Sequence, residues 1–550
     1  MNRLFDILYS LAEKIITIIF SIIIIYLLIL AGFSTTNVEL HTEHVLLGKD
    51  SIGLNLLVLI AFILIAYIAK NKAPAIKQLI KDINSQKKLY LICRNVLLAV
   101  TTVFALAFVF VAHKEAIGDQ HDVCDVAYAF RMNDLSIFEP GAYANEHPHQ
   151  FGIEIFIYCL SFLVGNYNYL AFQVLNIVAL LMIYLVFEFF AEYYGASNIT
   201  KLAVICFSVV FIPGLMYTTF VYGTLIGLCF SLYATKNILL FQKTLKYIYV
   251  LWTVICSVFA VSLKSNYMIF LIANVFLCIL ILLKNRKLRF GVIAILLLFV
   301  LLFNTKLMYT ITQGITGLEP GPGSSNLSYV AMGLQENEGL FDGWWNFYNT
   351  RSYMDADYDS VKQTELVKEY ISGRIKEFQG NPRMALRFFA GKNASQWNNP
   401  DFEVFWVNSV MPERWGYTEL KERIAADKIL SILFEALNYY QFIILTGVLM
   451  YVLLVDKKEV YLLFAMVFIG GFLFHTFWEA KAQYTLPYFM LLLPLSCIGY
   501  RNLITEMICE NSKLQTKRLQ LSVVIFLLFI TIIKFGNFSL LSDIFCQIRG

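Results

Sequence analysis

Charged residues are scarce in this sequence: only 15% of its 550 residues are Asp, Glu, Lys or Arg. A soluble chain of this length would carry about 25% and would divide into several domains. Hydrophobic residues instead make up 59% of the chain, in runs long enough to cross about 30 Å of hydrocarbon. The composition predicts an all-α polytopic membrane protein. The formal net charge is only +4, and we expect no nucleic-acid partner.

Three further features are missing. The ten cysteines include no CxxC pair and lie mostly inside apolar runs, which is typical of small side chains packed between helices. No small-residue cleavage site follows the apolar stretch Ile15–Ala31, so we interpret it as a retained helix rather than a signal peptide. No internal repeat is evident, which disfavours the inverted-repeat architecture of many secondary transporters.

Hydropathy predicts about thirteen membrane spans with two large loops between them, the second loop partly helical. The spans are placed at residues 13–33, 52–70, 90–112, 167–192, 198–216, 220–240, 246–263, 266–283, 289–305, 430–454, 459–476, 483–500 and 521–537. The apolar stretch Phe151–Val164 is short for a span. We interpret it as an interfacial or re-entrant helix, and whether it crosses fully stays open.

Lysine and arginine gather in alternate loops, such as segment 70–94. The positive-inside rule places these loops in the cytoplasm, so we expect the N-terminus there, in a multi-pass cell-membrane protein with an extracytoplasmic active site. All seven histidines then lie outside. The predicted parts are N-terminal transmembrane helices (1–112), a first large loop with a juxtamembrane helix (113–166), central transmembrane helices (167–305), an extracytoplasmic loop domain (306–429) and C-terminal transmembrane helices (430–550).

Three acids stand close together in the first large loop. Asp119, Asp122 and Asp125 are three residues apart, so on a helix they share one face. Such carboxylates repel one another unless solvent or a cation intervenes. They are either solvated loop acids or a site in which one acts as a general base or metal ligand. A divalent cation such as Mg²⁺ or Mn²⁺ is the cofactor that this second interpretation allows.

A second element of the loop is the turn around Pro148. Proline has no N–H and disfavours helical geometry in the residue before it, so the turn presents His147 and His149 together. Two histidines at this spacing need further ligands to hold zinc, and the sequence identifies none. The flanking Glu146 and Gln150 are candidates to line a substrate site.

A third element is Lys264, which stands between two apolar runs in "VSLKSNYMIF". A lysine at membrane level is costly, so it either snorkels to the interface or binds an anion such as a phosphate. Glu479, Lys481 and Tyr484 follow a late span, and Tyr222 precedes another. We expect these four side chains to line the same cavity.

These motifs resemble the GT-C superfamily of polyprenyl-phosphate-sugar-dependent glycosyltransferases, in its protein O-mannosyltransferase and aminoarabinose transferase branch (family 39-like). That branch begins its first large loop with Asp-Glu and ends it with His-Pro-Pro or Lys-Pro-Pro. Here these steps read Asp119-Gln120 and His147-Pro148-His149.

Later segments resemble the family as well. They are "VYGTLIG", "LKSNYMIF" and "AQYTLPYFMLLLPL", the last with Gln483 where the family has Arg. Two segments of the long loop, "YVAMGLQENEGLFDGWWNFYNT" and "GKNASQWNNPDF", resemble those of uncharacterised Gram-positive bacterial relatives. The likeness reaches across most of the chain in scattered islands.

The resemblance implies transfer of a sugar from undecaprenyl phosphate to an acceptor hydroxyl on a cell-wall polymer, glycolipid or protein. Asp119 or Asp122 would be the base, Lys264 with the two histidines of the turn would hold the donor phosphate, and the long loop would bind the acceptor. The protein would work among membrane lipids, with no certain cofactor. Two other functions stay open: a lipid-linked glycan flippase or transporter, and a polysaccharide ligase or polymerase.

Overall fold

The computed structural model describes residues 2–40, 43–112, 114–337, 341–410, 427–455 and 459–508. Helices dominate these ranges, and their only strands form one antiparallel hairpin, β1 (Ser34–Val38) with β2 (Val45–Lys49). Two of the seven histidines, His41 and His113, lie outside the described residues, as does the predicted span 521–537.

Nine helices in the described ranges are long and apolar enough to cross a membrane. They are α1 (Asn2–Phe33), α2 (Ile52–Asn71), α4 (Lys87–Ala112), α8 (Tyr169–Tyr193), α11 (Thr224–Thr244), α13 (Met268–Asn285), α14 (Arg289–Thr316), α21 (Asp427–Leu454) and α22 (Glu459–Phe477). A tenth forms if α9 (Asn198–Val210) and the segment Ile212–Thr219, bent by 63° at their junction, count as one span. The chain is an all-α polytopic membrane protein.

The predicted count of thirteen stays a prediction, because several apolar runs take other forms. α7 (Phe151–Val164) and α12 (Ile248–Leu263) are short apolar helices. The run predicted at 483–500 begins with the 3₁₀ turn η5 (Ala482–Thr485) and continues as α23 (Leu486–Ile508), which holds Pro494 in its interior.

α14 is longer than its predicted span, which ended at residue 305. The additional turns carry Tyr309, whose ring lies 5.3 Å from that of Phe151 at the start of α7. Met308 and Ile315 join the same small apolar cluster. Packing against α7 therefore extends the helix into what hydropathy alone assigned to the long loop.

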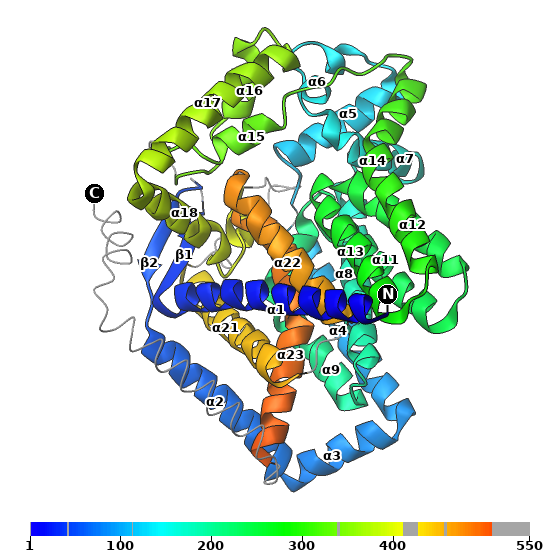
Figure 1. The fold of residues 1–550 in the computed structure, drawn as a ribbon, viewed down its shortest axis with the longest axis vertical. Coiled ribbons are helices and arrows are strands. Elements are labelled where there is room, and N and C mark those ends of the chain that lie inside the picture. Colours follow the sequence, from blue (N-terminus) through cyan, green and yellow to red (C-terminus); the bar gives the residue numbers. More distant parts are fainter. Residues whose placement is uncertain are drawn as a thin grey trace.

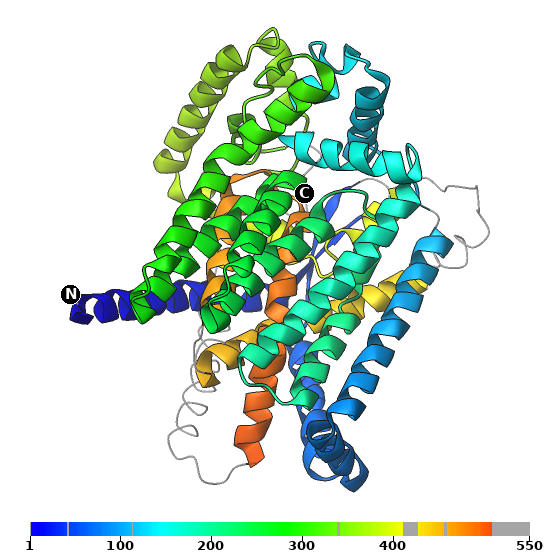
Figure 2. The same ribbon diagram turned by 90° about the vertical axis from the view of Figure 1, so that its right-hand side faces the viewer.

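The two large loops meet at one end of the molecule. The first supplies α5 (Asp119–Met132) and α6 (Tyr143–Glu146), and the second supplies α15 (Leu327–Met332), α16 (Tyr348–Asp355) and α17 (Ser360–Gly380). Both views place these helices together, with α3 (Pro74–Ser85) at the opposite end and α1 running crosswise to α23 (Figures 1 and 2). The long loop ends in α18 (Pro382–Trp397) and α19 (Val404–Val410).

α18 ties the long loop to the helical core. Trp397 at its end is only 1% exposed, and its ring lies 5.3 Å from Phe468 and 5.4 Å from Phe472 of α22. Lys392 of the same helix donates to the carbonyl oxygens of Gly333 and Trp478, each at 2.6 Å. The loop helices are thus held rigidly above the ends of the apolar helices.

Candidate functional site

The first turn of α5 is anchored by Gln120 rather than by its acids. The buried side-chain oxygen of Gln120 accepts a hydrogen bond from the backbone N–H of Val221 at 2.8 Å. This bond fixes the start of α5 against the segment that precedes α11. Gln120 stands where the resembling family has Glu, and here its amide has a structural role.

Asp119, the first residue of α5, faces open space although protein surrounds it on most sides. Loss of solvation raises the pKa of its carboxyl group. The charges of Lys481 and Lys264 and a hydrogen bond from Tyr143 act in the opposite direction. An accessible carboxylate among cations and a hydroxyl is the arrangement expected of a general base.

Lys264 reaches the same region because two glycines let three backbones approach closely. A Cβ atom on Gly152 of α7 would lie 2.1 Å from the carbonyl oxygen of Ser262, and one on Gly223 would lie 2.0 Å from that of Leu263. No other residue type fits either contact. The end of α12 is therefore pressed against α7 and the start of α11.

The Lys264 ammonium group has only neutral partners nearby. Nζ donates to the Thr224 hydroxyl at 3.0 Å and lies 4.8 Å from the ring centre of Tyr222 and 5.6 Å from that of Tyr484. Within the described ranges no carboxylate comes within the 4.0 Å of an ion pair. Burial lowers the pKa of Lys264 to about 8, against the opposing charges of Asp119 and Glu479.

Asp119 and Lys264 therefore belong to one polar cluster, in which each shifts the pKa of the other. We call it the Asp119–Lys264 cluster and define it by the seven residues Asp119, Tyr143, His149, Tyr222, Lys264, Glu479 and Tyr484. A small cavity beside it is lined by Thr224, Lys264, Asn266, Tyr267, Phe270, Gln483, Tyr484, Pro487 and Tyr488. The side chain of Gln483 is neutral, and its oxygen accepts a hydrogen bond from the Tyr217 hydroxyl at 3.0 Å.

The two histidines of the Pro148 turn differ in what they contact. His147 Nδ1 lies 3.2 Å from the Tyr329 hydroxyl, and its Nε2 lies 3.7 Å from Glu146 Oε1. The charge of Asp119 acts to raise the pKa of His149. The Nε2 atom of His149 lies 3.4 Å from the amide nitrogen of Gln150. Burial lowers the pKa of His147 to about 4 and that of His149 to about 3. Both imidazoles are therefore neutral at physiological pH and act through hydrogen bonds.

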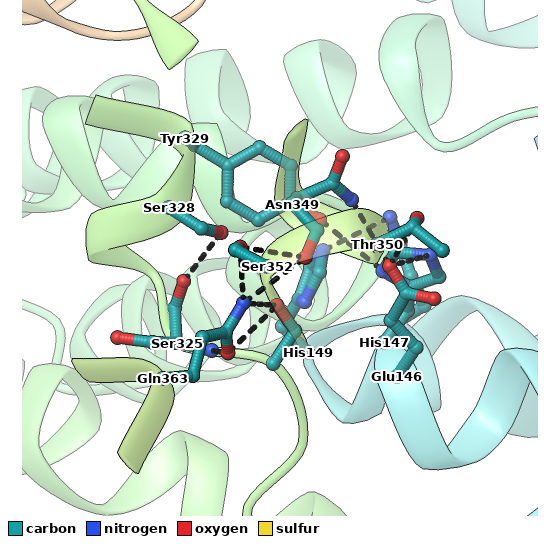
Figure 3. A network of polar contacts seen from close by, with 12 residues as sticks. Glu146, His147, His149, Ser325, Ser328, Tyr329, Asn349, Thr350, Ser352 and Gln363 are labelled. Carbon is teal, nitrogen blue, oxygen red and sulfur yellow. Dashed lines mark hydrogen bonds and ion pairs between the residues drawn. The ribbon is translucent and has the colours of Figure 1, made fainter. Parts of the chain in front are cut away.

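Glu146 fastens this turn to the long loop. Its Oε1 accepts from Asn349 Nδ2 at 3.1 Å and from the Thr350 hydroxyl at 2.6 Å. Its backbone oxygen also accepts from the N–H of Ser324 at 3.0 Å. Figure 3 shows the contacts continuing to buried Gln363, which donates to the backbone oxygen of Asn349. The sequence predicted Glu146 to line the substrate site, and the structure gives it this bracing position.

The candidates from the later part of the chain also converge here. Gln150 donates to the Tyr222 hydroxyl, and the Tyr484 hydroxyl donates to Glu479 Oε1 at 2.7 Å. The other oxygen of Glu479 is buried without a hydrogen-bond partner in the described part of the chain. Burial raises the pKa of Glu479 to about 7. Lys481 forms an ion pair with Glu43 from the hairpin connection.

The other two acids of α5 point into a different environment. Burial raises the pKa of Asp122 to about 6, and repulsion by Asp119 and Asp125 adds to this, as the predicted like-charge face implies. Asp125 lies 3.5 Å from His121 Nε2 and accepts from the Tyr167 hydroxyl at 2.9 Å. Of Asp119 and Asp122, Asp119 is the one whose pKa is lowered by the charge of Lys264.

Several residues around the site were not predicted from the sequence to be site residues. Tyr143 and Tyr329 belong to short helices, and the Trp478 ring stacks on Tyr329 at 5.1 Å. The buried His475 ring stacks on Tyr484 at 5.5 Å. In the described ranges, no group of three or more His, Cys, Asp or Glu residues is placed to hold a metal ion.

No protein-family model matches this sequence, and no curated protein matches it with significant similarity.

Proposed function

We propose that the protein is a GT-C-like membrane glycosyltransferase of the cell membrane, acting on its extracytoplasmic side. It moves a sugar from a polyprenyl phosphate to an acceptor hydroxyl on a cell-wall polymer, glycolipid or protein. The observation that carries the proposal is that one cluster holds an accessible carboxylate, Asp119, and a cation, Lys264, whose nearest partners are neutral.

The proposed reaction needs both groups. The acceptor oxygen attacks the anomeric carbon, the bond from that carbon to the phosphate oxygen breaks, and the phosphate leaves with the electron pair. Asp119 takes the proton of the acceptor hydroxyl, and Lys264 stabilises the charge on the departing phosphate. Below its pKa of about 8, Lys264 carries the charge that this role requires.

The histidine turn supports the phosphate side of the reaction. Since both ring nitrogens of His147 have protein partners, its proposed role is to hold the turn in place. His149 remains to donate an N–H hydrogen bond to a phosphate oxygen. Asp122 is kept as the alternative base, although its surroundings are acidic.

The position of Lys264 suits a lipid-borne substrate. It lies between two apolar helices, α12 and α13. A polyprenyl chain in the bilayer could lie along such helices while its phosphate reaches the cation at their ends.

The decisive experiment compares Asp119→Asn with Asp122→Asn in purified protein supplied with a radiolabelled polyprenyl-phosphate sugar and a cell-wall extract. We expect Asp119→Asn to lower the transfer rate by roughly 10²- to 10⁴-fold, since a general base contributes that much, and Asp122→Asn to lower it far less. Full activity in Asp119→Asn would remove the assignment of the base. Full activity in both variants would remove the cluster as the active site.

Two further readouts separate the remaining functions. Lipid scrambling by the protein in liposomes without any glycosidic transfer would replace the proposal with a flippase. Transfer only from donors that carry long glycans would replace it with a ligase or polymerase. Cell-wall glycan analysis of a deletion strain would identify the sugar and its acceptor through the missing substituent.

A further inference from the structure

A second cavity, of about 550 Å³, lies in the long loop beside the hairpin connection. It is lined by Glu43, Gln335, Glu336, Asn337, Phe341, Trp344, Trp345, Asn346, Phe347 and Arg351. Its volume falls within the range of small-molecule binding sites. None of these residues belongs to the Asp119–Lys264 cluster.

Two aromatic rings lie against each other in this cavity, tilted by 50°, and one of them is open to solvent. The ring centres of Trp345 and Phe347 lie 3.8 Å apart, and Phe347 is 57% exposed. Phe347 also has a φ of 64°, a left-handed backbone conformation that is costly for a bulky residue. Core packing explains neither the exposure nor the strain, and such strain often marks a ligand site.

The polar lining is preorganised. Asn346 Nδ2 donates to Gln335 Oε1 at 2.7 Å and to Asn337 Oδ1 at 2.5 Å, so three amides are held in one network. The backbone oxygen of Asn346 accepts from Arg351 at 2.8 Å. Binding of a ligand here would cost little conformational entropy, because the polar side chains are already held in place.

The acids of the lining are neutralised by cations outside it. Glu336 lies 2.6 Å from Arg374, and Glu43 pairs with Lys481. The lining also holds Arg351, which donates to the backbone oxygen of Asn346. Aromatic faces, amides, paired carboxylates and this hydrogen-bond donor together suit a molecule rich in hydroxyl groups. The C–H face of a sugar ring stacks on an aromatic ring, while its hydroxyls exchange hydrogen bonds with amides and carboxylates.

Lys481 connects this cavity with the proposed active site. Its Nζ lies 5.5 Å from the ring centre of Trp345, and its partner Glu43 is part of the lining. Among the charges around Asp119, that of Lys481 lowers the pKa of its carboxyl group the most. A molecule held on Trp345 and Phe347 thus lies next to a residue that acts directly on the proposed base.

We propose that the Trp345–Phe347 cavity is the acceptor subsite of the enzyme and that it binds a neutral oligosaccharide, a proposal that rests on the function proposed above. The sugar rings stack on the two aromatic side chains, and the amide oxygens of Gln335, Asn337 and Asn346 accept hydrogen bonds from their hydroxyls. The acceptor is then a glycan chain rather than a protein or a simple lipid.

The test measures binding of maltohexaose, mannohexaose, chitohexaose and poly(glycerol phosphate) to the full-length protein in detergent by saturation-transfer NMR and calorimetry. We expect at least one neutral hexasaccharide to bind and the anionic polymer not to bind. Trp345→Ala and Phe347→Ala should each weaken that binding by roughly tenfold or more, as for central aromatic contacts in other interfaces. Phe303→Ala removes a ring of similar exposure (51%) from α14 and serves as the matched control.

The outcomes separate this subsite from the proposed reaction. Asp119→Asn should bind the hexasaccharide as wild type does, because Asp119 is not in the cavity. Failure of all three neutral probes to bind, binding of poly(glycerol phosphate) alone, or unchanged affinity in both aromatic variants would overturn the subsite. Those results would leave the roles of Asp119 and Lys264 in transfer standing, whereas an active Asp119→Asn enzyme would overturn the roles and leave a measured glycan affinity intact.

Discussion

Two polar clusters in this protein use the same residue types and differ in how completely they are paired. Around Glu459, the Lys284 ammonium lies at 3.1 Å and the Tyr193 hydroxyl donates at 3.3 Å. In the Asp119–Lys264 cluster, Lys264 has a hydroxyl and two aromatic rings as its close partners. The lysine of the first cluster forms an ion pair with a carboxylate, whereas the lysine of the second donates to a neutral hydroxyl.

The difference matters because a buried charge without a partner costs several kcal/mol. A fold tolerates that cost where the partner arrives from outside, which is why perturbed and unpaired groups gather at functional sites. In the proposed reaction the partner of Lys264 is the donor phosphate, and the partner of Asp119 is the hydroxyl of the acceptor.

The two clusters should differ most in how the loss of their lysine changes kcat/KM. Lys264→Met should lower kcat/KM for transfer by roughly 10²- to 10³-fold, as expected when an electrostatic contact to developing charge is lost. Lys284→Met should leave kcat/KM close to wild type, since its carboxylate partner is Glu459 and not the substrate. Steady-state kinetics with a polyprenyl-phosphate sugar, on protein checked for a single gel-filtration peak, make the comparison.

Equal losses in the two lysine variants would show that Lys264 serves the fold rather than the reaction. Unaltered kcat/KM in Lys264→Met would remove it from the phosphate site.

A smaller effect should appear in the pH dependence of transfer. Asp119 must be deprotonated to act as a base, so kcat/KM should rise with pH through its raised pKa. Lys264 must be protonated to hold phosphate, so kcat/KM should fall above a pH of about 8, by about tenfold per unit. The measurement is kcat/KM across the range of pH in which the protein stays folded.

The Lys264→Arg variant checks the origin of the alkaline limb. A guanidinium group keeps its charge far above this range, so the fall should move to a pH beyond about 10. An unchanged alkaline limb in an active Arg variant would assign it to a different group.

Most of the helical framework followed from hydropathy because a long apolar run has few alternatives in a membrane. The nine long apolar helices all fall on predicted runs. What composition could not show is where packing overrides it. α14 continues to Thr316 because Tyr309 packs on Phe151, a contact between residues far apart in the sequence.

The sequence pointed to several residues of the candidate site but not to the contacts between them. Asp119, Lys264 and the histidine turn stood out because charge is rare in this chain. The contact between Tyr329 and His147 joins residues 182 apart in the sequence, and the ion pair of Lys481 with Glu43 joins residues 438 apart. No local pattern encodes such pairs. Gln120 looked like a departure from a family motif, and its bond to Val221 gives the amide a reason of its own.

The smallest effect sharpens the comparison through stability instead of rate. Glu459→Gln removes the partner of Lys284, but that lysine is 41% exposed, so the loss should be about 1 kcal/mol or less. Glu479→Gln should change stability even less, because the amide oxygen still accepts from Tyr484 and a buried group with an unpartnered oxygen loses its charge. Thermal unfolding in one detergent, followed by intrinsic fluorescence, ranks the two variants. If Glu479→Gln unfolds at a clearly lower temperature than Glu459→Gln, the Asp119–Lys264 cluster is a structural network like the one around Glu459. Its charged groups would then stabilise the fold rather than bind a substrate.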